Sequence, residues 1–142
     1  MSTLRRLFLG FNAVVAVAIG LLALAAPATL LAGKGVTLPN DAAQVWVREV
    51  GVMILALGVT LWRVRRHASS PTLRALFAGA TVVHFGMLPI ELMAHARGTI
   101  PALASVVPNS ILHACMAAGF AWLALERDRR VTSDPPYAVG PS

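Results

Sequence analysis

Three ionisable side chains in the third apolar stretch of the sequence share one helical face. His84, Glu91 and His95 stand seven and four residues apart. At about 100° per residue, these spacings turn all three side chains into one stripe. Imidazole and carboxylate groups transfer protons, and an ionisable residue at the centre of a membrane helix costs about 2.5–3.5 kcal/mol. We therefore expect function at this stripe.

Polar residues of the other apolar stretches lie at a similar distance from the basic ends of those stretches. At about 1.5 Å per residue, Glu91 lies at about 25 Å, Arg48 at about 22 Å and His113 at about 20 Å. Residues at one level in three helices can form one pocket if the bundle turns them inward. We predict a polar pocket in the outer half of a bilayer. Its predicted ligand-binding residues are Arg48, Glu49, His84, Glu91, His95, Asn109 and His113.

The same residues allow an enzyme and a purely structural alternative. In an enzyme, Glu91 acts as general acid or base, His113 or His84 is its proton partner, and Arg48 stabilises a developing anion. The substrate is then a quinone, an isoprenoid or a similar lipid-soluble compound. In the structural alternative, Arg48 neutralises Glu91 across two helices, or Arg48 and Glu49 extend to the membrane interface.

A metal or haem site is a further alternative. Glu91 and His95 are four residues apart, and His113 or His84 would supply a third ligand or a facing haem ligand. The sequence contains no His-Glu-x-x-His motif and no cysteine pair. We therefore assign no metal ligand and leave the cofactor unknown. The lone Cys115 is predicted to be a small buried hydrophobic residue.

The composition indicates the environment in which these side chains must work. Of 142 residues, 57% are hydrophobic and 13% are charged, about half of the usual share of charge in a soluble domain. This excludes an ordinary soluble enzyme, a disordered chain and a disulfide scaffold. The net charge is +6, but the arginines form short clusters between apolar runs. Such clusters are typical of membrane topology signals, and we predict no nucleic-acid partner.

We predict an all-α fold, an integral membrane four-helix bundle formed by residues 1–126. The apolar runs are long enough to cross a bilayer of about 30 Å and lack the alternation of a β-barrel. A cleaved signal peptide ending at the triplet 23–25 is an alternative for the first run, which is longer than a usual signal core. Residues 127–142 are predicted to be a disordered polar cytoplasmic tail. The four predicted helices span residues 7–32, 42–62, 73–96 and 109–126.

The distribution of positive charge predicts the orientation of the bundle. Nine of the twelve positive residues flank one side of the predicted helices. Because positively charged loops stay in the cytoplasm, we expect both termini there and the protein in the bacterial inner membrane. The nine residues are Arg5, Arg6, Arg63, Arg65, Arg66, Arg74, Arg127, Arg129 and Arg130.

Two segments resemble the DoxX-like superfamily of small bacterial four-helix membrane proteins. They are LLALAAPATLLAGKGVTLPN at the end of the first run and VREVGVMILALGVTLW in the second. The resemblance covers about residues 7–125, and Arg48 and Gly51 are the family-like positions. It implies a four-helix fold, and some members are linked to thiol, sulfur and quinone redox chemistry. A chain whose one cysteine is Cys115 departs from any dithiol mechanism.

These observations predict a small membrane protein that binds a lipid-soluble molecule in a polar pocket or acts as an accessory subunit. Its expected partners are the lipid bilayer, a lipid-soluble small molecule, and a membrane protein or a second copy of the chain. Gly51 and Gly58, seven residues apart on one helical face, predict a close-packed helix contact.

Overall fold

The computed structural model describes residues 2–36 and 40–126, and within these ranges the fold is all-helical. Four of the helices are long and apolar enough to cross a membrane, the same number of long apolar helices as predicted. The predicted tail, 127–142, lies outside the described residues. The helices are α1 (Thr3–Ala25), α2 (Pro27–Gly33), α3 (Asp41–Val64), α4 (Pro71–Ala96) and α5 (Leu103–Leu125).

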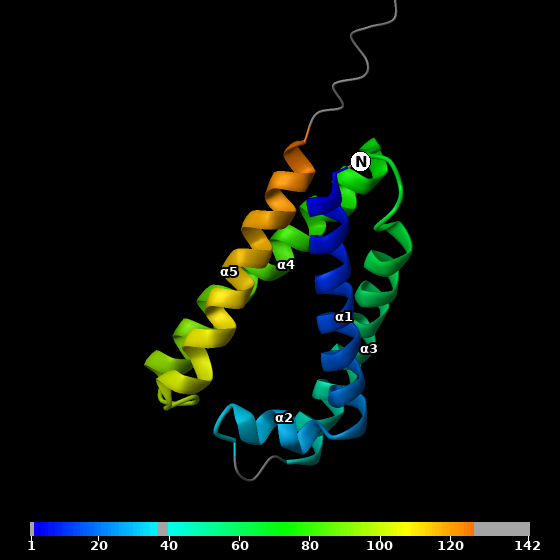
Figure 1. Ribbon diagram of the computed structural model, residues 1–142. Helices are drawn as coiled ribbons and strands as arrows, with labels where there is room; N and C mark the ends of the chain where they lie inside the picture. The colour runs from blue at the N-terminus through cyan, green and yellow to red at the C-terminus, as the bar shows by residue number, and fades with distance from the viewer. Residues whose placement is uncertain (1, 37–39, 127–142) are drawn as a thin grey trace, which may run out of the picture.

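The first predicted helix, 7–32, is divided in the structure into α1 and the short α2. Ala26 interrupts the helix with φ −141° and ψ 61°, and Pro27 begins α2. Proline has no N–H to donate and disfavours helical geometry at the preceding residue, so the chain turns here. α2 runs across one end of the bundle, as Figure 1 shows. The described chain thus has five helices, not four.

The last helix begins at Leu103, six residues earlier than the sequence pattern predicted. Pro108, the residue before the predicted start at 109, lies inside the helix. As the sixth residue of α5, Pro108 has no N–H to donate to the carbonyl of Ala104, and the helix continues through it. The bounds of α3 and α4 differ from the prediction by one or two residues at their starts and by at most two at their ends.

The long helices pack as two pairs, α1 with α3 and α4 with α5 (Figure 1). In the first pair, Gly20, Gly51 and Gly58 are buried where the helix backbones approach closely. An added Cβ at Gly58 would lie 2.9 Å from the backbone nitrogen of Val17. The predicted close contact through Gly51 and Gly58 is confirmed.

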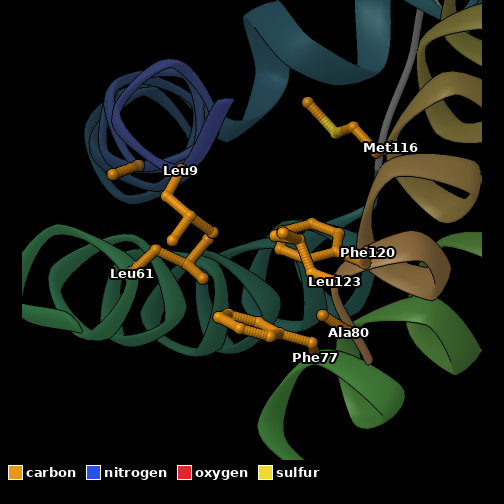
Figure 2. Packing of buried hydrophobic residues seen from close by; sticks show 8 residues of the cluster. Leu9, Leu61, Phe77, Ala80, Met116, Phe120 and Leu123 are labelled. Atoms are coloured by element: carbon orange, nitrogen blue, oxygen red, sulfur yellow. The ribbon is translucent and has the colours of Figure 1, made fainter. Parts of the chain in front are cut away.

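The apolar core lies where the two pairs meet, near the start of α1 and the end of α5. Phe120 is fully buried, and its ring packs edge-on against Phe8 at 5.2 Å and stacks on Phe77 at 6.1 Å. Contacts of this kind hold the four long helices together at this end, as Figure 2 shows. The core residues are Leu9, Ala13, Leu61, Phe77, Ala80, Met116, Phe120 and Leu123.

Candidate functional site

A buried carboxylate, Glu91, lies between α4 and α5 in the half of this helix pair that is away from the apolar core. Glu91 has 9% of its surface exposed and forms an ion pair with Lys34. Asn109 Nδ2 donates a hydrogen bond of 2.6 Å to Glu91 Oε1, and Ser110 Oγ donates one of 3.2 Å to Oε2. Both carboxylate oxygens are therefore paired, as a buried charge requires.

Lys34 reaches Glu91 because α2 lies across the end of the bundle. Lys34 is the C-cap residue of α2, and its side chain is 32% exposed. Its ammonium group also donates to the backbone carbonyl of Ser105 at 3.4 Å. Lys34 thus connects α2 to α4 and α5 through polar contacts, away from the apolar core. We call Lys34, Glu91, Asn109 and Ser110 the polar cluster.

Two histidines extend this polar surface toward the apolar core. His84 Nδ1 and His113 Nδ1 lie 2.9 Å apart, so one ring donates a hydrogen bond and the other accepts it. The His84 ring also stacks on Phe120, with centroids 5.5 Å apart. His113 follows Asn109 by one helical turn on α5. Polar side chains therefore line the α4–α5 contact from Glu91 to the edge of the core.

The structure brings together only some of the predicted site residues. Glu91 contacts Asn109, and His84 contacts His113. Arg48 and Glu49 are exposed on α3, and within the described chain no hydrogen bond or ion pair joins Arg48 to Glu91. The cation beside Glu91 is Lys34, in place of the Arg48 that the sequence analysis paired with it.

His95 has a local role at the end of α4. Its Nδ1 lies 2.8 Å from the carbonyl oxygen of Ile100. Since a carbonyl only accepts, His95 donates this hydrogen bond and carries a proton on Nδ1. This hydrogen bond stabilises the turn between α4 and α5, next to the C-terminal end of α4.

The donor atoms do not form a metal site of ordinary geometry. Within residues 2–36 and 40–126, no three His, Cys, Asp or Glu side chains are grouped as metal ligands. Cys115 is exposed on α5, so the prediction that it is buried is wrong.

Sequence reasoning missed two members of the polar cluster, Lys34 and Ser110. Lys34 was not among the predicted site residues, because the helix before it was counted as one span ending at residue 32. Two signals pointed to it: Pro27 breaks that helix, and Lys34 is the single lysine beside eleven arginines. Ser110 gave no signal beyond its position next to Asn109.

The fold and the cluster define a class of protein: a helical membrane protein with several spans and a buried ion pair near one end of the bundle. A family profile described as "Domain of unknown function (DUF4345)" matches residues 4–88, more than half of the chain. The chain belongs to this family. The match includes Lys34 and His84 but ends before Glu91, and it does not test the resemblance to the DoxX-like superfamily, which stays a prediction. No curated protein and no solved structure matches the chain.

Proposed function

We propose that the protein binds a small lipid-soluble molecule at the polar cluster, in the outer half of the bacterial inner membrane. The observation that carries the proposal is the buried Glu91 carboxylate, which accepts from Lys34, Asn109 and Ser110. Burying these groups in a membrane helix is costly, and polar residues inside membranes are retained mainly where they serve a site.

The chemistry of the cluster indicates the class of ligand. An ammonium, an amide N–H and a hydroxyl converge from α2 and α5 on one point of α4. Such donors recognise carbonyl or hydroxyl oxygens, as in a quinone or an isoprenoid alcohol. A ligand oxygen would take the donors that Glu91 now occupies, and the partly exposed Lys34 side chain is the one that must move.

The orientation is proposed from the arginines. Arg6, Arg65 and Arg66 line one groove, and Arg5 lies 5.5 Å from the ring of Phe77, so these cations share one end of the bundle. The polar cluster lies toward the other end. By the positive-inside rule, this arrangement supports cytoplasmic termini and a cluster in the outer half.

The orientation can be measured with reporter fusions. A reporter that fluoresces only in the cytoplasm is expected to be bright when fused after Ser142. Inserted after Arg97, in the turn between α4 and α5, the same reporter is expected to be dark. The reverse pattern would place the polar cluster in the cytoplasmic half and contradict the proposed orientation.

Ligand binding can be tested by purifying the full chain from membranes in mild detergent and identifying bound small molecules by mass spectrometry. We expect one lipid-soluble species at near-stoichiometric amount. The double variant Asn109→Leu/Ser110→Ala removes two neutral donors and leaves the ion pair. At about 1 kcal/mol per hydrogen bond, it should weaken retention of the ligand about thirty-fold.

Thr81→Val is the matched control. The Thr81 hydroxyl donates a hydrogen bond of 2.9 Å to the backbone carbonyl of Phe77 in its own helix. Thr81→Val therefore removes a hydroxyl from α4 that is not part of the polar cluster. The control should retain the ligand. Equal retention by the double variant would contradict the proposed site. A stoichiometric membrane protein in place of a small molecule would favour the accessory-subunit alternative.

A further inference from the structure

A second surface feature lies at the arginine-rich end, away from the polar cluster. An open groove of about 630 Å³ runs between the first turns of α1 and the end of α3. Three arginines line it, together with Trp62 and an apolar strip of α1. The lining residues are Thr3, Arg6, Leu7, Gly10, Phe11, Val14, Trp62, Arg65 and Arg66.

Arg6, Arg65 and Arg66 are the three arginines that line the groove. Arg65 lies 3.4 Å over the Trp62 ring and donates to the Trp62 backbone carbonyl, so its position is fixed. Desolvation and the charges of Arg66 and Arg6 lower the pKa of the Arg65 guanidinium, which as an arginine stays charged. In the described part of the chain, none of the three forms an ion pair with a carboxylate.

We propose that this groove binds one anionic glycerophospholipid. The phosphodiester would lie between Arg6, Arg65 and Arg66, because planar guanidinium groups bind phosphate oxygens through paired hydrogen bonds. Among residues 2–36 and 40–126, no acidic side chain lines the groove, so an anionic headgroup is complementary to its arginines.

The apolar strip of α1 distinguishes a lipid from a free anion. Leu7, Phe11 and Val14 have more than half of their surfaces exposed, and they extend the groove for two helical turns below the arginines. Gly10 lies between them, and an added Cβ there would meet no atom within 4 Å. The first part of an acyl chain can pack against this strip. Inorganic phosphate has no acyl chain and would not use it.

The test uses the purified full chain in detergent, titrated with phosphatidylglycerol or phosphatidylcholine of identical acyl chains and observed by native mass spectrometry. We expect the wild-type chain to prefer phosphatidylglycerol. Arg6→Gln/Arg66→Gln should bind it about thirty-fold more weakly, which corresponds to about 2 kcal/mol for two arginines. The control Arg63→Gln/Arg74→Gln removes the same charge at the same end outside the groove. It should change binding by less than about three-fold.

A steric variant tests the groove with all arginines in place. Gly10→Leu adds bulk to the apolar strip at a position where a Cβ meets no atom within 4 Å, and it should also weaken phosphatidylglycerol binding. Equal losses in the two double variants would show attraction to surface charge in general and overturn the site. Displacement of the lipid by millimolar inorganic phosphate would show a plain anion site and overturn the lipid assignment. Binding unchanged in Gly10→Leu would place any bound lipid elsewhere.

Discussion

Replacing Lys34 with methionine is expected to lower the free energy of unfolding by about 3 kcal/mol. The variant leaves the Glu91 carboxylate buried among helices without its cation, and an unpaired buried charge costs about 3–5 kcal/mol. Two hydrogen bonds, from Asn109 and Ser110, remain and hold the loss to the lower part of that range. Denaturant titration of the chain in lipid–detergent bicelles measures the change.

The reverse substitution should cost less. Glu91→Met leaves Lys34 alone, but its side chain is already 32% exposed and a long ammonium chain can turn toward the interface. We expect a loss of about 1 kcal/mol. The order of the two effects follows from burial: Glu91 is enclosed by α4 and α5, whereas Lys34 lies at the edge of the bundle.

The double variant Lys34→Met/Glu91→Met isolates the interaction. Apolar replacement of a whole buried pair is often neutral or stabilising, so its stability should return to within about 1 kcal/mol of the wild type. With the double variant at the wild-type value and single losses of about 3 and about 1 kcal/mol, the coupling energy is about 4 kcal/mol. Arg48→Gln, which removes an exposed cation from α3, is the control and should change stability by at most about 0.5 kcal/mol.

Additive effects of Lys34→Met and Glu91→Met would mean that the two charges do not stabilise each other in the bilayer. A large loss in Arg48→Gln, with Lys34→Met silent, would restore the pairing of Arg48 with Glu91 that the sequence analysis considered. Either result would remove the structural basis of the proposed ligand site.

The polar cluster shows which part of a membrane site can be predicted from sequence. Helical spacing placed Glu91 in one stripe of the third apolar stretch, and Asn109 was among the residues predicted to line the same pocket. Both inferences depend on the regular geometry of a single helix. The cation of the cluster was not predicted, because Lys34 reaches Glu91 through a change of chain direction at Pro27. Arg48, which was counted to the same level as Glu91, is exposed on α3.

The fold was predictable to a similar depth. Hydrophobic length alone identifies the four long helices, since an apolar run of about twenty residues is long enough to cross a bilayer. The pairing of α1 with α3 and of α4 with α5 depends on which side chains fit across each contact. The spacing of Gly51 and Gly58 predicted a close contact on α3, but it did not indicate that α1 is the partner helix.

Adding one methyl group at the contact between α1 and α3 is expected to lower the free energy of unfolding by the second largest amount. In Gly58→Ala the new Cβ would lie 2.9 Å from the backbone nitrogen of Val17 and 3.0 Å from the backbone oxygen of Ala13. Backbone atoms of a helix cannot move aside singly, so α1 and α3 must separate. We expect a loss of about 1–3 kcal/mol, the usual cost of overpacking, measured by the same titration.

Gly79→Ala is the matched control, because an added Cβ at Gly79 of α4 meets nothing within 4 Å. It should be neutral or stabilise the helix by up to about 1 kcal/mol. If Gly58→Ala and Gly79→Ala behave alike, the close approach of α1 and α3 does not exist in the membrane.

Exchanging a methyl group between the two helices tests the same contact without changing its total volume. An added Cβ at Gly51 would lie 2.7 Å from the Cβ of Ala23, so Gly51→Ala alone should destabilise the pair. Ala23→Gly removes the opposing methyl group, and the double variant Ala23→Gly/Gly51→Ala should recover most of the loss. Recovery requires that these two positions touch, because a helix weakened by glycine at position 23 would otherwise add its own cost. A double variant less stable than either single one would therefore contradict the packing of α1 against α3 at this point.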